Sequence, residues 1–280
     1  MNHSTNASAR ELRAEALSLL CEADVARKVA LTRDLHAQWL ARQIDVEPTA
    51  KPVPQAALPG RPLRPALVPP REVGKRPMNT VEGRAALIHA LAHIEFNAIN
   101  LALDAIWRFA GMPREFYGDW LQVASEEALH FSLLDAHLRT LGHAYGDFSA
   151  HNSLWEMAES TAGDVTARMA LVPRTLEARG LDATPAVRAK LAQVGDHEAA
   201  AILDIILRDE VGHVAIGNRW YHWLCQRDAK DPVALYAELS VRHKAPQPRG
   251  PFNLDARRAA GFSDEEMAVL EAAGLAHMLT

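Results

Sequence analysis

The sequence has few cysteines, few aromatic residues and no excess of basic charge. Its 280 residues include two cysteines, Cys21 and Cys225, which stand far apart and cannot build a disulfide framework. Aromatic residues make up 6% and the formal net charge is −5, so the composition carries no basic footprint for nucleic acid. Two reduced thiols are typical of the cytosol, and a cytoplasmic protein is therefore expected.

Long apolar runs and a leader segment are lacking as well. The first ten residues, MNHSTNASAR, have no apolar core after their charges, so no signal peptide is expected. No uninterrupted apolar run approaches the roughly 20 residues needed to span a bilayer, which predicts a protein without a membrane segment. Hydrophobic residues nevertheless form 49% of the chain. This Ala/Leu-rich composition favours helices over sheets, and an all-α fold is expected.

Periodicity and proline content divide the chain into four parts. Residues 1–45 carry apolar residues at helical spacing and predict N-terminal helices that pack on the rest of the protein. Residues 46–79 hold nine of the 16 prolines, which excludes a regular helix. This arm is either a linker or an extended segment that buries its own apolar side chains, and the sequence leaves both open. Those side chains are Leu58, Leu63, Leu67 and Val68.

Residues 80–225 predict a bundle of four long helices. The first covers residues 80–110 and the second residues 113–141, with Gly111-Met112-Pro113 as the turn, because glycine commonly follows one helix and proline opens the next. The fourth covers residues 196–225. No strand-like alternation of useful length interrupts these segments.

The third helix of the bundle is expected to be less regular. It begins at the motif Ser153-Leu154-Trp155-Glu156, which fits a capping box, and Pro173 predicts a kink. Residues 180–183 are expected to interrupt it. Thr184-Pro185 then fits an N-cap followed by proline at the first helical position.

Residues 226–280 predict a tail of short helices. One is expected to open at Asp231-Pro232, since proline suits the first turn of a helix. Another is expected at Ser263-Asp264-Glu265-Glu266, which fits a capping box. The stretch KAPQPRGPFN between them is expected to be extended.

Six residues of the predicted bundle have the type and spacing of metal ligands. The second and fourth helices each carry Glu-x-x-His, and residues three apart share one face of a helix, so a carboxylate and an imidazole can reach the same ion. The first and third helices each add a glutamate, a ligand set known from di-metal four-helix bundles. Carboxylate oxygens and imidazole nitrogens suit iron or manganese. The six residues are Glu95, Glu127, His130, Glu177, Glu210 and His213.

The spacing of these glutamates indicates that they share one level of the bundle. Glu95 lies 16 residues before Gly111 and Glu127 lies 16 after it, so at about 1.5 Å per residue each is roughly 24 Å from the turn. Glu177 and Glu210 repeat this spacing, 33 residues apart against 32 for the first pair. Ionised carboxylates in such apolar helices are unfavourable unless they are paired or bind metal.

Two further acids are expected to support the histidines. Metal-bound histidines usually donate their second N–H to an acid or a carbonyl group. Glu126 and Asp209 each precede a predicted ligand. We expect Asp209 to contact His130 and Glu126 to contact His213 across the bundle. The alternative is that both acids are outward-facing charges.

Four strings of the sequence carry a resemblance to a known family. HALAHIEFNAINLALD, ASEEALHFSLL, RDEVGHVAIGNRWYHWLC and GPFNLDARRAAGF resemble an uncharacterised bacterial group, domain-of-unknown-function family number 455, placed among the ferritin-like proteins. That group is similar in turn to the di-iron hydroxylase that acts on the isopentenyl side chain of a hypermodified adenosine in tRNA. The resemblance implies a ferritin-like bundle and the same six ligands. Many di-iron oxygenases have Arg before the motif histidine, where this chain has Leu129 and Gly212.

The ligand set and the resemblance predict an oxygen-dependent di-iron oxidoreductase, a hydroxylase of unspecified substrate. Two iron ions are the expected cofactor, with manganese or a mixed pair as alternatives. Such an enzyme needs an electron donor, a reductase or a ferredoxin-like protein. The sequence also leaves open an iron-handling or peroxide-consuming ferritin-like protein, and a helical scaffold without catalysis. A homodimer is a further expectation.

A tRNA substrate would require a basic surface, whereas a small-molecule substrate would not. Two groups of basic residues could supply such a surface, and solvated linker charges are the alternative explanation for both. The first group is Arg61, Arg64, Arg71, Lys75 and Arg76, and the second is Arg242, His243, Lys244 and Arg249.

Overall fold

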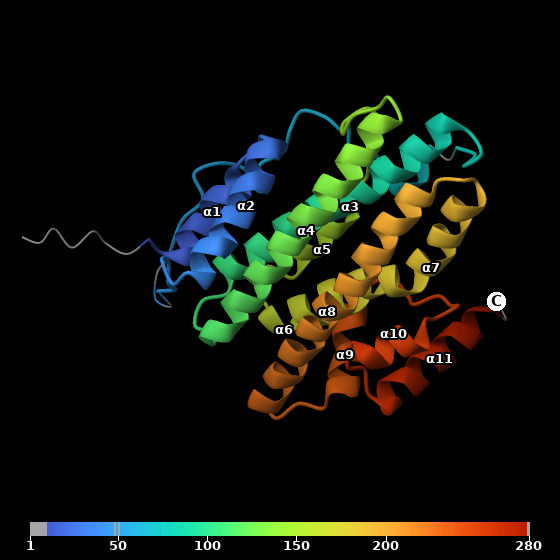
Figure 1. Ribbon diagram of the computed structural model, residues 1–280. Coiled ribbons are helices and arrows are strands. Elements are labelled where there is room, and N and C mark those ends of the chain that lie inside the picture. The colour runs from blue at the N-terminus through green and yellow to red at the C-terminus, as the bar shows by residue number, and fades with distance from the viewer. Residues whose placement is uncertain (1–9, 48, 50, 75, 279–280) are drawn as a thin grey trace, which may run out of the picture. The chain divides into compact units, whose positions relative to one another are not determined.

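The fold is all-α, as the composition predicted (Figure 1). The computed structural model describes residues 10–278 except 48, 50 and 75. Within this described part, the β pairing consists of two isolated parallel bridges, Glu11 with Asp45 and Leu67 with Ala150. By its contacts the chain gathers into two compact units, one made of the residues up to 63 with residues 98–129, the other of residues 64–97 with the chain from 130 onward.

Two helices span the boundary between the units without a break. They are α3, Val81–Arg108, and α4, Arg114–Thr140, which match the first two predicted bundle helices. Gly111 in the turn between them has a φ of 73°, a conformation that glycine adopts without strain. The predicted division of the chain at residues 45, 79 and 225 stays a prediction.

The first unit contains the two N-terminal helices, α1 (Leu12–Cys21) and α2 (Val25–Leu40). α1 is fixed to the end of α3 by the buried Arg13, whose guanidinium donates to the Trp107 carbonyl oxygen at 2.8 Å. α2 is fixed to the start of α4, where a Cβ added to Gly118 would lie 3.0 Å from the Trp39 indole nitrogen. The N-terminal helices therefore contact the end of α3 and the start of α4.

The proline-rich arm is anchored at its centre to the first unit. The buried ammonium of Lys28 donates to three acceptors, the carbonyl oxygens of Leu20 and Gly60 and the side-chain oxygen of Asn100, the last at 2.5 Å. Gly60 approaches α1 so closely that an added Cβ would lie 2.1 Å from the Cys21 carbonyl oxygen. A residue with a side chain could not make this contact.

The apolar side chains of the arm do not behave as one buried set. Leu63 is 102% exposed and Leu67 is 40% exposed, so of the two alternatives the burial of apolar side chains does not hold for these leucines. Leu58 and Val68 are half-buried. The arm instead buries Pro59, Gly60 and Pro65, because backbone contacts rather than leucines hold it in place. Further along, residues 70–72 form a 3₁₀ turn, η1. Pro48 and Lys75 lie outside the described residues.

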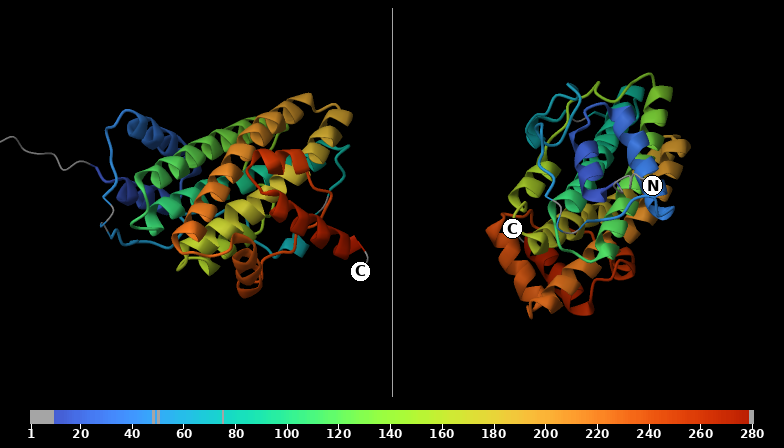
Figure 2. Two further views of the ribbon diagram at one scale, coloured as in Figure 1. Left: turned by 90° about the horizontal axis from the view of Figure 1, so that it is seen from below. Right: turned by 90° about the vertical axis from the view of Figure 1, so that its left-hand side faces the viewer.

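The second unit contains the remaining helices, which follow one another with short connections. Their bounds are α5 Ser153–Ser160, α6 Val165–Leu171, the π-helical turn η2 Val172–Glu177, α7 Ala178–Gln193, α8 His197–Arg227, α9 Pro232–Arg242, α10 Leu254–Ala259 and α11 Asp264–Met278. α8 packs along α6, η2 and α7, and the views in Figure 2 show it beside α7. α8 matches the predicted fourth bundle helix, with Asp196 as its N-cap.

The third bundle helix begins at Ser153 as predicted, but its cap and its break differ from the prediction. Its start, α5, is capped by Asn152 rather than Ser153, and Glu156 makes no capping bond there. The helix breaks between Ser160 and Val165, not at residues 180–183. The kink predicted at Pro173 takes the form of the π-helical turn η2, which the Ala178 N–H closes by bonding to the Pro173 carbonyl oxygen.

α7 continues through Pro185, where the sequence predicted a new helix. A proline inside a helix leaves the carbonyl group four residues earlier without its usual amide donor. Here that carbonyl belongs to Leu181, and it accepts a hydrogen bond from the Asn253 side chain at 3.2 Å. The prediction of a break was wrong because the compensating donor comes from the tail, 72 residues from Leu181.

The tail forms two of its helices as predicted. Asp231 caps α9 by accepting from the Ala234 N–H at 2.7 Å. Ser263 and Glu266 form a reciprocal capping box on α11, with N···O distances of 2.8 and 3.2 Å. The sequence did not predict the short helix α10. Its N-cap is Asn253, which accepts from the Ala256 N–H at 3.3 Å.

Among the described residues, α3 alone is long and apolar enough to cross a membrane by length and composition. Isolated charges such as Glu95 and Asp104 hide this stretch from a search for uninterrupted apolar residues. The burial of 72% of its apolar window is typical of a core helix, which passes the same test in soluble proteins.

Lys28 should make the stability of the first unit depend on pH. Burial lowers its pKa from the ordinary value near 10.5 to about 7, so the unfolded chain binds more protons than the folded chain between these values. The free energy of unfolding should therefore rise with pH in that window. From pH 7 to pH 9, we expect the free energy of unfolding of wild type to rise by roughly 1–3 kcal/mol relative to that of Lys28→Met. The reason is that a difference of one bound proton corresponds to about 1.4 kcal/mol per pH unit.

Urea unfolding at pH 7, 8 and 9 measures this difference. Lys190→Met, which removes an exposed lysine of α7, is the control and should follow wild type at every pH. Parallel stability curves for wild type and Lys28→Met would contradict the assignment.

Candidate metal centre

The predicted ligands stand on four helical segments. α3 carries Glu95, α4 carries Glu127 and His130, η2 ends at Glu177, and α8 carries Glu210 and His213. Each Glu-x-x-His motif lies within one unbroken helix, so its carboxylate and imidazole are one turn apart on the same face.

Four of the six residues form a buried cluster. One ligand atom from each of Glu95, Glu127, His130 and Glu210 lies within 4.8 Å of the other three. All four side chains are buried, from 0% exposed at Glu127 and His130 to 8% at Glu210. Three carboxylates and one imidazole at this spacing could hold a metal ion.

The second histidine lies beside this cluster. The His213 ring is fully buried, and its centre is 5.8 Å from the centre of the His130 ring. Its Nδ1 atom is 3.7 Å from Glu210 Oε1 on the same helix. His213 is not one of the four clustered residues, although its position brings a second imidazole toward them.

Glu177 is the predicted ligand that the structure places least directly. Its side chain is half-buried, and it stands outside the four-residue cluster. It is the last residue of the π-helical turn η2, just before α7. Turns of this kind are rare and are frequently found at functional sites.

The orientation of His130 follows from its two acidic neighbours. Its Nε2 atom lies 3.1 Å from Asp209 Oδ2, and its Nδ1 atom lies 3.5 Å from Glu95 Oε2. Because a carboxylate only accepts, Nε2–H donates to Asp209, which directs Nδ1 toward Glu95 and the cluster. A metal-bound histidine with a carboxylate behind it has this arrangement.

Asp209 is held in its charged form by its own contacts. Burial alone would raise its pKa, but hydrogen bonds from Arg208 and from His130 outweigh burial and bring the pKa below its ordinary value. The Arg208 Nε atom lies 2.8 Å from Asp209 Oδ1. Asp209 therefore makes the contact with His130 that the sequence predicted.

The other predicted supporting acid, Glu126, has a different neighbour on its own helix. Its carboxylate accepts from the Gln122 side chain at 3.0 Å, and its charge acts on His36 of α2. Burial lowers the pKa of His36, and Glu126 opposes that shift. A contact between Glu126 and His213 stays a prediction.

The sequence of the chain matches a known protein family. The profile of the family described as "Protein of unknown function (DUF455)" matches residues 21–268. The chain belongs to the DUF455 family. An "Uncharacterized protein" of Haemophilus influenzae (strain ATCC 51907 / DSM 11121 / KW20 / Rd) is 51% identical over 249 residues, which cover 86% of each chain. No solved structure matches the chain. The DUF455 match includes all six predicted ligands and the capping box of α11.

Three aromatic side chains of this DUF455 protein pack against one another, and two of them adjoin cluster residues in the sequence. Phe96 follows Glu95 and Phe131 follows His130, and their ring centres are 5.7 Å apart. Tyr145 packs against both rings, at 5.7 and 5.1 Å. Tyr145 was missed in the sequence because it stands in a loop, where helical spacing gives no signal.

The remaining histidines near these helices have structural partners. His93 Nδ1 lies 2.8 Å from the Tyr145 hydroxyl oxygen, and its Nε2 lies 3.1 Å from the His151 carbonyl oxygen and 3.0 Å from the Asn97 side-chain nitrogen. His89 accepts from the Gly146 N–H at 2.9 Å, and burial lowers its pKa to about 4. Neither is part of the DUF455 cluster.

Like charges at the cluster should destabilise the metal-free protein. One carboxylate oxygen of Glu95 lies within 4.8 Å of one of Glu210 in a buried site. Two ionised carboxylates at this separation repel each other. We expect Glu210→Gln to raise the melting temperature of the metal-free protein by a few degrees, since about 1 kcal/mol corresponds to roughly 2–4 °C in a chain of this size.

Scanning calorimetry in the presence of a chelator measures this shift. Glu271→Gln, which neutralises an exposed glutamate of α11, is the control and should melt with wild type. A lower melting temperature for Glu210→Gln would show that the carboxylates are not in conflict without metal.

Proposed function

We propose that this DUF455 protein is a ferritin-like di-metal carboxylate protein with two iron ions. The observation that carries the proposal is the buried cluster of three carboxylates and one imidazole within 4.8 Å. Buried charges of one sign at this spacing are unfavourable unless a cation neutralises them. His213 beside Glu210, and Glu177 at the end of η2, complete a set of six ligands.

The residues present fit a pair of divalent ions of the iron or manganese kind. Carboxylate and imidazole donors without thiolates suit these metals, and the two cysteines of the chain stand elsewhere, Cys21 at the end of α1 and Cys225 near the end of α8. Glu95 and His130 would hold one ion, and Glu210 and His213 the other, because each pair is already in contact. Glu127 and Glu177 would supply the remaining carboxylates.

The proposed activity is that of an oxygen-dependent oxidoreductase, in the manner of a hydroxylase. When bound, two ferrous ions supply the electrons that reduce dioxygen. The chain itself orients the His130 ring through its contact with Asp209. A reductase or a ferredoxin-like protein would have to restore the electrons after each turnover.

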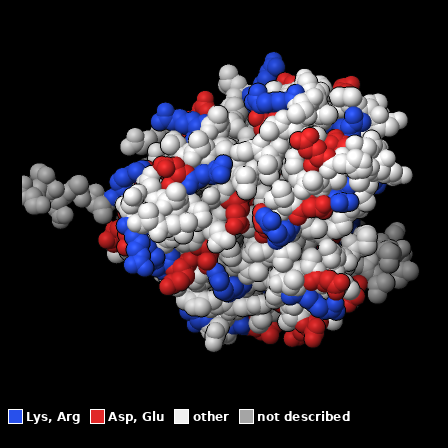
Figure 3. All heavy atoms as spheres, viewed as in Figure 1, with Lys and Arg blue, Asp and Glu red and all other residues white. Residues whose placement is uncertain are grey.

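The two groups of basic residues lend little support to a tRNA substrate. Several of their members are paired with neighbouring acids: Arg71 with Glu72, Arg76 with Glu82, and Arg242 with Glu238. On the face drawn in Figure 3, basic and acidic side chains are interspersed. A small-molecule substrate is the proposal that these charges favour.

Metal analysis tests the proposed centre directly. Protein loaded anaerobically with ferrous iron should bind two ions per chain, and Glu127→Ala should lose at least one while its helices remain formed by circular dichroism. Asp209→Asn should weaken binding by about 10- to 100-fold, as is usual when the partner of a metal-bound histidine is changed. Glu271→Gln serves as the unaffected control. Two ions retained by Glu127→Ala would contradict the ligand assignment.

Exposure to oxygen separates the proposed oxidoreductase from an iron-handling protein. A transient visible absorption band after oxygen is mixed with the ferrous protein would support oxygen activation. Direct conversion to a ferric product, without such a band and with continued uptake of added iron, would support iron handling and overturn the oxidoreductase.

A further inference from the structure

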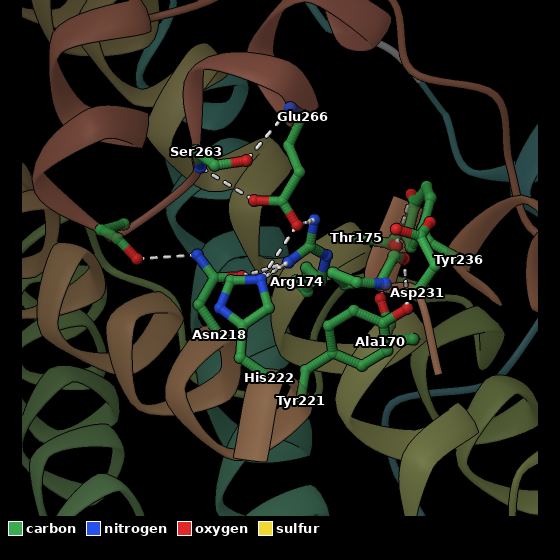
Figure 4. A network of polar contacts seen from close by, with 12 residues as sticks. Ala170, Arg174, Thr175, Asn218, Tyr221, His222, Asp231, Tyr236, Ser263 and Glu266 are labelled. Carbon is green, nitrogen blue, oxygen red and sulfur yellow. Dashed lines mark hydrogen bonds and ion pairs between the residues drawn. The ribbon is translucent and has the colours of Figure 1, made fainter. Parts of the chain in front are cut away.

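The turn that ends at Glu177 contains a buried arginine tied to the tail of the chain. Arg174 is 4% exposed, and its guanidinium bonds to Glu266 of α11 at 2.5 Å and to the Asn218 side-chain oxygen of α8 at 3.0 Å (Figure 4). His222 Nε2 lies 3.0 Å from the same oxygen of Glu266. Burial alone would raise the pKa of Glu266, but the His222 hydrogen bond and the Arg174 charge hold it at about 2. The pair is therefore charged at neutral pH.

Aromatic rings enclose the Arg174 side chain. Its guanidinium carbon lies 4.8 Å from the ring centre of Tyr221, 5.3 Å from that of Tyr236 and 4.8 Å from that of Phe262. Faces of aromatic rings attract a cation, and more strongly where water is absent. The enclosing rings come from α8, from α9 and from the turn before α11, so separate segments converge on one residue of η2.

The residues on both sides of Arg174 are fixed as well. A Cβ added to Gly217 of α8 would lie 2.5 Å from Pro173 Cβ, so the turn rests directly on the α8 backbone. The Thr175 hydroxyl bonds to the Ala170 carbonyl oxygen at 2.8 Å and lies 2.9 Å from the Tyr236 hydroxyl. Three consecutive residues of η2 are thus held from outside the turn.

We propose that Glu266 and Arg174 are positioning residues that hold η2 in its π-helical form and thereby set the direction of Glu177. This inference rests on the proposed function, because it takes Glu177 as a metal ligand. A π-helical turn contains one residue more than the corresponding α-helical turn. Successive residues of a helix are about 100° apart, so relaxation of η2 to α-helical pairing would rotate Glu177 by about that angle. A ligand turned this far could not serve the same ion.

The chain offers a matched control in a second buried ion pair, which joins the tail to α7, the helix that follows η2. Arg257 of α10 donates to Asp182 of α7 at 2.6 Å, and both side chains are largely buried. Like Arg174–Glu266, this is a buried arginine–carboxylate pair with one partner in the tail. Asp182 lies beyond Glu177, outside η2, and Asp182→Asn retains the Arg257 side chain that also bonds to the Ala178 carbonyl oxygen, so this change should weaken the tail without altering the turn.

The test compares Glu266→Gln with Asp182→Asn in the full-length protein. Anaerobic titration calorimetry with Mn²⁺ measures both metal affinities, and hydrogen exchange measures the protection of the η2 amides in the metal-free protein. We expect Glu266→Gln to weaken one of the two sites by about 10- to 100-fold, the range usual for groups that orient a ligand. Exchange at the η2 amides should accelerate at least tenfold. Asp182→Asn should leave both metal affinities and η2 exchange unchanged.

Tyr236→Phe is a milder variant in case Glu266→Gln fails to fold. It removes the hydroxyl next to Thr175 without loss of volume, and it should weaken the same site by a smaller factor. Equal metal affinities and equal η2 exchange in Glu266→Gln and Asp182→Asn would overturn the positioning role. Failure of the wild-type protein to bind two ions would instead overturn the proposed function, and η2 exchange would still report whether the ion pair holds the turn.

Discussion

The structure depends on the convergence of acidic side chains inside an all-helical core. Helices bury apolar faces readily, but Glu95, Glu127 and Glu210 bring negative charge to one buried place. A neutralising cation is the simplest way to stabilise that arrangement. Asp209 contributes to the arrangement as well, because its contact with Nε2 orients the His130 ring. The cluster is thus a region where the metal-free protein gives up stability, as a binding site would.

The long helices and most of the cluster could be predicted because their signals are local. Apolar spacing fixed α3, α4 and α8 to within a few residues, and the Glu-x-x-His motif depends only on helix geometry. The capping box on α11 was visible for the same reason, since its two residues bond to each other's backbone. Where a residue and its bonding partner are close in the sequence, the sequence alone was sufficient to predict the local structure.

The third bundle helix was predicted poorly because its partners come from far along the chain. Pro185 reads as a break, yet Asn253 supplies the donor that the Leu181 carbonyl would otherwise lack. The π-helical form of η2 has no local signature beyond Pro173, since contacts with Gly217, Tyr236 and Glu266 hold it. The proline-rich arm is a similar case, in which Gly60 and Lys28 matter more than the leucines.

The dependence of α7 on Asn253 has a consequence for folding during synthesis. Ribosomes release a chain from its N-terminus, so Leu181 emerges long before the asparagine that pairs with its carbonyl group. Until the last thirty or so residues are free, the third helix cannot reach its final form, nor can the turn that presents Glu177. Nascent chains would therefore bring Glu177 to its final position only after the segment that contains Asn253 and Glu266 has emerged.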